Sequence, residues 1–149
     1  MNALDIDLVL VPVDGSEEST AAVEYAVAVA AEYDATVHSV YVLGENVVRA
    51  IENGAVEESA VAEDSEAFNE TAREIAAARD VPLVTSAARG FSTKTKLLHP
   101  GSVVLDTAEE VAADFIVVPR EPQTGDPVEV LEKAAEYVLL YASQPVLSV

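Results

Sequence analysis

Apolar positions along the chain alternate between short β-branched runs and longer amphipathic segments. The first run, Leu8–Val13, is apolar on both faces apart from Pro12, which lacks an N–H and therefore fits the last residues of a strand. Asp14 and Gly15 predict a turn, and Ser16 opens an acidic, alanine-rich helix. Ligands of open α/β sheets bind at the carboxyl ends of strands, so this strand end is the first candidate for a site.

The same alternation predicts the remaining elements. Apolar runs predict strands over Thr36–Val42, Leu83–Ala88 (an edge strand), Asp114–Pro119 and Val146–Val149. Helical spacing predicts helices over Thr20–Asp34, Val56–Arg79, Val103–Ala112 and Val128–Tyr141, with a short helical turn at Val47–Ile51. Three side-chain roles follow: Ser102 as an N-cap, and Tyr33 and Leu139 as inward-facing residues. Strands that alternate with helices favour an α/β fold, a single domain over residues 1–149 with a parallel sheet covered on both faces.

The net charge is the feature of the composition that says most about the surface and the possible partners of the protein. The chain has 27 acidic and 8 basic residues, a net charge of −19, yet half of it is apolar, which is not the composition of a disordered acidic tail. Two interpretations remain open: an acidic face for a basic partner, or a solvated surface adapted to high salt. We favour the salt-adapted, halophilic surface because the acids fall on every predicted exposed face. Nucleic acid is disfavoured as a partner because phosphates need clustered Lys and Arg.

The composition also bears on the cellular compartment of the protein and on the kinds of site that it can form. The chain has no cysteine, which excludes disulfides and thiolate metal sites and fits a cytoplasmic protein. No secretory signal and no apolar run long enough to span a membrane are present, so we expect no membrane association.

No pattern of catalytic or metal-binding residues stands out. His38 lies inside a predicted strand, where a packed, hydrogen-bonded role is favoured over a functional one. No Gly-x-Ser-x-Gly or His-Glu-x-x-His pattern occurs, and the acids are patterned for the surface instead of paired in an apolar cleft. We therefore predict no enzymatic activity and no metal.

One stretch departs from the acidic pattern. No acid occurs from Val81 to Leu105, and this stretch contains four basic or titratable side chains: Arg89, Lys94, Lys96 and His99. It follows the third predicted strand, so it emerges at the same end of the sheet as Asp14. These side chains could hold an anion or an acidic patch of a partner, or they could simply offset the surrounding negative surface. We favour charge offset.

Four segments together resemble the universal stress protein (UspA-like) family: Val9–Ser16, Val40–Val42, Ala108–Val118 and Ala135–Val149. The resemblance covers nearly the whole chain and identifies it as an acidic member of haloarchaeal type. It implies an open five-stranded parallel sheet of order 3-2-1-4-5, a Rossmann-like α/β/α sandwich. It also implies a homodimer, often paired through the last strand.

Many members of this family bind ATP or AMP through a loop of the pattern Gly-x-x-Gly, nine residues, then Gly-Ser or Gly-Thr. Counting back from Ala135 puts Pro119, Pro122, Glu132 and Lys133 at those positions. No glycine is present, two prolines remove backbone donors, and only Lys133 suits an anion. The ATP motif is therefore degenerate, and we expect no cofactor.

The half of the family's nucleotide site that contacts the base and ribose is retained in this sequence. The resemblance gives Asp14 as its acidic residue and Val13 and Val42 as its apolar contacts, although Asp14 is also a common turn residue. Three hypotheses result. The first is a non-enzymatic stress-response module that acts as a homodimer, with an unknown protein partner. The second is a sensor that binds ATP, AMP or another anion weakly near Asp14 and the basic stretch. The third, a weak nucleotide hydrolase, is the least supported.

Overall fold

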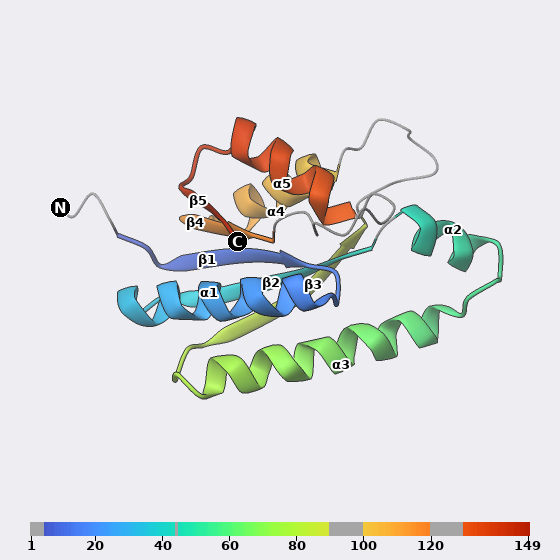
Figure 1. The fold of residues 1–149 in the computed structure, drawn as a ribbon, viewed down its shortest axis with the longest axis horizontal. Coiled ribbons are helices and arrows are strands. Elements are labelled where there is room, and N and C mark those ends of the chain that lie inside the picture. Colours follow the sequence, from blue (N-terminus) through green and yellow to red (C-terminus); the bar gives the residue numbers. More distant parts are fainter. Residues whose placement is uncertain (1–4, 44, 90–99, 120–129) are drawn as a thin grey trace.

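The structure, a computed structural model, describes residues 5–43, 45–89, 100–119 and 130–149 (Figure 1). Its parallel sheet has five strands in the order β3-β2-β1-β4-β5, which confirms the predicted order. The strands are β1 (Leu8–Val13), β2 (Thr36–Leu43), β3 (Leu83–Arg89), β4 (Phe115–Val118) and β5 (Val146–Ser148). The helices are α1 (Glu17–Tyr33), α2 (Glu45–Glu52), α3 (Glu58–Ala77), α4 (Pro100–Glu110) and α5 (Val130–Tyr141).

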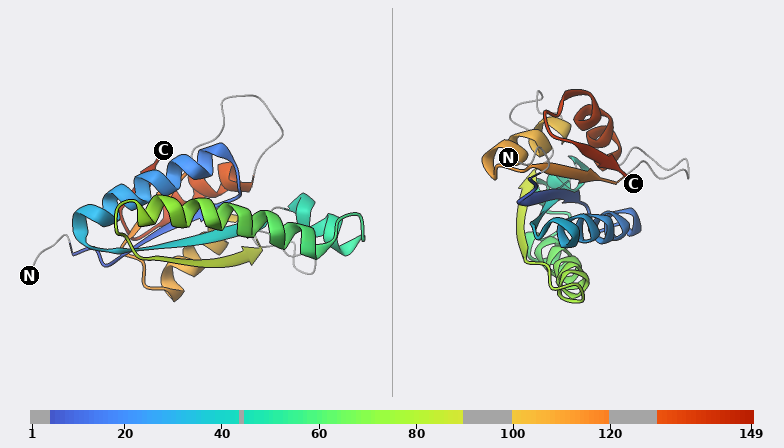
Figure 2. Two further views of the ribbon diagram at one scale, coloured as in Figure 1. Left: turned by 90° about the horizontal axis from the view of Figure 1, so that it is seen from below. Right: turned by 90° about the vertical axis from the view of Figure 1, so that its left-hand side faces the viewer.

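Two layers of helices bury the sheet between them (Figures 1 and 2). On β1, Val9, Val11 and Val13 face α1 and α3, whereas Leu10 faces α4 and α5. All four side chains are fully buried because successive strand residues point to opposite faces and both faces are covered. The continuous apolar run at the start of the chain is therefore the centre of the core.

The central strand pairs unequally with its two neighbours. It pairs with β2 along its whole length, from Leu8 opposite Thr36 to Val13 opposite Tyr41. It pairs with β4 only at Val9 and Leu10. Beyond Leu10 the two strands no longer pair, and Pro12, which has no N–H to donate, lies in this stretch as expected. This is the point where the strand order reverses, the usual place for a ligand in such sheets.

The opposite end of β1 is tied down by a side chain. Asp114 Oδ2 accepts hydrogen bonds from the backbone N–H groups of Asp7 (2.9 Å) and Leu8 (3.1 Å). Asp114 directly precedes β4, so the carboxylate fixes the amino ends of two neighbouring strands together.

Three predicted side-chain roles are wrong. Ser102 is not an N-cap, since α4 already begins at Pro100; proline suits the first position of a helix because it lacks only an N–H that has no partner there. Tyr33 is 41% exposed and Leu139 is 53% exposed, although both fit the helical spacing. Spacing also misses Asn69, which is buried on α3.

Helix boundaries shift by a few residues from the predicted ones. Helix α1 begins at Glu17 instead of Thr20, and α3 spans Glu58–Ala77 instead of Val56–Arg79. The short helical turn expected at Val47–Ile51 is part of a longer helix, α2. Asp34 ends α1 in a left-handed conformation with φ of 55°, which a short polar side chain tolerates.

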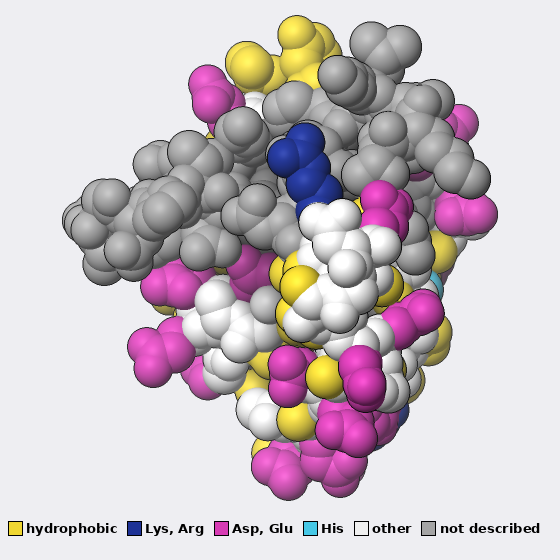
Figure 3. Space-filling model, turned by 90° about the vertical axis from the view of Figure 1, so that its right-hand side faces the viewer, with side chains coloured by type: hydrophobic (Ala, Val, Ile, Leu, Met, Phe, Trp, Pro, Cys, Tyr) yellow, Lys and Arg dark blue, Asp and Glu magenta, His cyan; other side chains and the backbone are white. Residues whose placement is uncertain are grey.

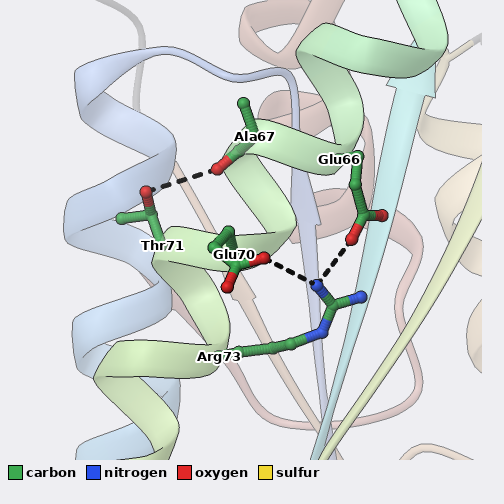
Figure 4. A network of polar contacts seen from close by, with 5 residues as sticks. All are labelled: Glu66, Ala67, Glu70, Thr71 and Arg73. Carbon is green, nitrogen blue, oxygen red and sulfur yellow. Dashed lines mark hydrogen bonds and ion pairs between the residues drawn. The ribbon is translucent and has the colours of Figure 1, made fainter.

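Acidic side chains on α3 share one cation. Arg73 Nη1 lies 2.7 Å from Glu66 Oε1 and 3.7 Å from Glu70 Oε2 (Figure 4). Its hydrogen bond and charge hold the pKa of the Glu66 carboxyl below its usual value. All three side chains are exposed, so this network contributes little to stability. Among the described helices, none is long and apolar enough to cross a membrane.

His38 has the structural role that its position predicts. Its side chain is buried on β2, and Nε2 lies 2.8 Å from Ser86 Oγ on the neighbouring strand β3. Burial lowers the pKa of His38 below 6.5, because the charged imidazolium loses hydration.

This burial makes stability depend on pH. Below its ordinary pKa of 6.5, His38 takes up a proton more readily in the unfolded chain than in the folded one. We therefore expect the His38 contribution to the free energy of unfolding to fall as the pH is lowered from about 7.5 to about 5.5. Urea unfolding of the native chain and of His38→Gln, measured across this range, isolates the contribution. The native chain should lose stability more steeply than the variant, and parallel curves would contradict the assignment.

Candidate functional site

Asp14 lies at the carboxyl end of β1, and its carboxylate closes the turn into α1. Oδ1 accepts hydrogen bonds from the Ser16 N–H (3.0 Å) and from the Ser19 hydroxyl (2.7 Å). The Asp14 N–H in turn donates to Ser19 Oγ (2.9 Å). Ser19 is fully buried, so its two bonds with Asp14 satisfy a hydroxyl that has little access to water.

Ser16 caps α1 from the same turn. Its backbone is extended, with φ of −76° and ψ of 169°, and its side chain accepts a hydrogen bond from the Ser19 N–H (3.2 Å). Glu17 and Glu18 in the first turn favour the positive end of the helix dipole. The three residues Asp14, Ser16 and Ser19 thus form one connected unit, here called the Asp14 turn.

Tyr41 closes the other side of the Asp14 turn. Its hydroxyl donates to the Asp14 backbone oxygen (3.1 Å), and its ring meets Phe68 of α3 edge-on, with 6.3 Å between ring centroids. Gly15 has φ of +88°, and a Cβ there would lie 2.8 Å from the Tyr41 hydroxyl oxygen, so a larger residue would be strained twice. Burial, followed by the charges of Asp14 and Asp64, raises the pKa of Tyr41 above 10.0. Tyr41 is the residue that sequence reasoning missed, because its contact spans 27 positions.

The three residues predicted as a half-site differ in burial and in the face of the sheet on which they lie. Asp14 is partly exposed. Val13 is fully buried among residues of α1 and α3, whereas Val42 is fully buried on the opposite face among residues of α4 and α5. Neither valine side chain offers surface to a ligand in this structure. Their contact with a ligand stays a prediction.

The other predicted site residues are only partly described. Pro119 is buried directly after β4. Glu132 and Lys133 lie in α5 and Arg89 ends β3, but their side chains are not among those described. Pro122 and the remaining members of the basic stretch, Lys94, Lys96 and His99, lie outside the described residues. Within the described part of the chain, no group of three or more His, Asp or Glu side chains could hold a metal ion.

The chain is similar in sequence and in fold to known proteins. A model of the universal stress protein family matches residues 6–149. The universal stress protein UspA of Lactobacillus plantarum is 22% identical with a TM-score of 0.70, and the match covers 99% of each chain. A universal stress protein of Archaeoglobus fulgidus in complex with dAMP is 19% identical with a TM-score of 0.64, covering 96% of each chain. A universal stress protein in complex with cAMP is 20% identical with a TM-score of 0.65, covering 97% of each chain. No curated protein matches the chain.

The Asp14 turn makes a direct prediction about Ser19. Ser19→Ala removes the hydroxyl that bonds both the carboxylate and the N–H of Asp14, and leaves the Asp14 N–H without its partner. We expect the free energy of unfolding to fall by about 1–3 kcal/mol. Ser59→Ala is the matched control, because Ser59 is exposed near the start of α3; it should change stability by less than about 0.5 kcal/mol. Equal effects of the two changes in urea unfolding would show that the Asp14 turn is not held by Ser19.

Proposed function

Because the chain belongs to the universal stress protein family, we propose that it is a non-enzymatic stress-response or regulatory module that lacks the ATP phosphate-binding loop and acts as a homodimer through protein contacts. We place it in the cytoplasm of a cell with high internal salt. The absence of cysteine and the net charge of −19 support this placement.

The observation that carries the proposal is the use of Asp14. The Oδ1 atom of the one acidic residue of the half-site already accepts bonds from Ser16 and Ser19 within its own turn. The apolar residues of the half-site, Val13 and Val42, are both fully buried. The turn explains the presence of Asp14 without any ligand, so the residue alone does not argue for a nucleotide.

The far side of the site gives the second support. Phosphate binding needs backbone N–H groups that approach the anion closely, which glycines permit. Pro119 and Pro122 have no N–H, and Glu132 adds negative charge at a third position of the pattern. Lys133 is the only residue of the four that would favour phosphate.

The proposed dimer rests on the end of the chain. Leu139, Leu140 and Tyr141 at the end of α5 are 53%, 70% and 65% exposed. The chain then continues into β5, which lies at one edge of the sheet and pairs only with β4 among the described strands. An exposed strand edge next to large apolar side chains favours burial against a second copy.

A nucleotide sensor is the second candidate, because two structurally similar family members were solved with cAMP and dAMP. Asp14 also lies at the reversal of strand order, where ligands of open α/β sheets bind. This candidate needs only the half-site, without the phosphate loop, so its affinity for nucleotides would be weak.

Thermal unfolding in molar KCl separates the two candidates. We expect ATP, AMP and cAMP at millimolar concentration to leave the melting temperature unchanged. A ligand present at 100 times its dissociation constant should add about 2.7 kcal/mol to the free energy of unfolding, which is readily measured. A stabilisation that disappears in Asp14→Ala but remains in Lys133→Ala would replace the proposal with the sensor.

The dimer makes its own prediction. Leu140→Glu places a charge in the exposed apolar end of α5, and we expect it to convert the dimer to a monomer in light scattering coupled to size exclusion. Val84→Glu is the matched control, since Val84 is 48% exposed on β3, at the opposite edge of the sheet. The control should remain dimeric. Dissociation by both variants, or a native chain that is monomeric at micromolar concentration, would refute pairing through α5 and β5.

A further inference from the structure

A cavity of about 350 Å³ opens beside the carboxyl ends of β2 and β3, under α2 and the first turns of α3. Its volume falls within the range of small-molecule sites. The lining residues come from four elements: Tyr41, Leu43, Ile51, Glu58, Val61, Ala62, Ser65, Ala87 and Ala88. Figure 3 looks onto this end of the molecule, where acidic side chains are interspersed with exposed hydrophobic ones on the described part of the face, and a basic side chain also lies near its middle.

This cavity is separate from the half-site at Asp14. It lies on the α3 face of the sheet, whereas Val42 points to the opposite face, among residues of α4 and α5. Tyr41 lies between the two, with its ring on the cavity and its hydroxyl on the Asp14 backbone oxygen. Because that hydroxyl already donates to the protein, the Tyr41 surface toward the cavity acts mainly as an aromatic wall.

The lining specifies the chemistry of an occupant. Most of the wall is aliphatic or aromatic, so it favours a compact apolar body. Among the lining residues that the structure describes, Glu58 is the only ionisable one besides Tyr41, and it is exposed at the start of α3. Asp64, one position before the lining residue Ser65, adds a second negative charge close enough to act on Tyr41.

We propose that this cavity is a binding site for a small hydrophobic organic cation, whose apolar body packs against Tyr41, Val61 and Ala87 and whose positive group lies at Glu58. The cavity lies on the opposite face of the sheet from Val42, and its ligand would be positively charged, whereas a nucleotide is negatively charged. This site does not depend on the proposed function, since neither the Asp14 turn nor the dimer surface lines the cavity.

Three probes of one shape and different charge test the ligand class: 1-adamantanamine, 1-adamantanol and 1-adamantanecarboxylate. In titrations of isotope-labelled full-length protein followed by NMR, we expect the amine to bind with a dissociation constant on the order of 1 mM or below. The methyl signals of Ile51, Val61 and Ala87 should shift. The carboxylate should bind at least about threefold more weakly, since it would face Glu58. Absence of binding by all three probes, or binding of the carboxylate as tight as that of the amine, overturns the proposal.

Variants on the same helix test the location. Ala62→Phe fills the cavity from α3 and should weaken amine binding at least about tenfold. Ala67→Phe is its matched control, because Ala67 is exposed on α3 but does not line the cavity. Glu58→Gln should weaken only the amine, by about two- to fivefold, whereas Glu63→Gln, also exposed on α3, should not. Unchanged binding in both Ala62→Phe and Glu58→Gln would overturn the site, and the Glu58 pair decides the question if Ala62→Phe fails to fold.

Discussion

A single carboxylate joins the centre of the sheet to its first helix. Asp14 ends the most buried strand, and its Oδ1 accepts bonds from the Ser16 N–H and the hydroxyl of the fully buried Ser19. Ser16 and Ser19 belong to the start of α1, so these bonds set where α1 begins relative to β1. The side chains of α1 that cover the sheet, such as Val23 and Val27, depend on that starting point. Removal of this link would leave polar groups of the turn buried without partners, which is costlier than the loss of an exposed bond.

The same link shapes what the end of the sheet can do. A carboxylate at a reversal of strand order is well placed for a ligand, but here its Oδ1 atom bonds within its own turn. Tyr41 reinforces that turn from β2 by bonding the Asp14 backbone oxygen, and Gly15 leaves room for the Tyr41 hydroxyl. On the opposite face of the sheet from Tyr41, His38 of β2 and Ser86 of β3 satisfy each other across neighbouring strands. The Asp14 turn and the His38–Ser86 pair therefore both serve the fold.

Two apolar surfaces remain unused by the fold. Helix α5 contributes a narrow buried stripe, in which Ala135 and Val138 are buried while Leu139 and Leu140 stay exposed. Helix α3 begins beyond the carboxyl ends of the strands (Figure 1), and the space that it leaves with α2, β2 and β3 is the cavity beside Tyr41. The two surfaces lie on different elements. We propose the first as a contact with a second copy of the chain and the second as a site for a small molecule.

The residue pattern alone predicted the five strands and most of the buried face of α1, because a run such as Val9–Val11 is stable only when both faces are covered. The strand order followed from the resemblance to the universal stress protein family, and the structure confirms it. The residue pattern also identified Asp14 as a turn residue and His38 as a packed one, since local pattern decides both. Only the tertiary structure decided the exposure of Tyr33 and Leu139, because helical spacing marks a face but not how wide a neighbour covers it. The contact of Tyr41 with Asp14 and the cavity between α2 and α3 were likewise outside the reach of the sequence. Both arise where separate elements meet, and no local preference of the chain encodes the distance between elements that are remote in sequence.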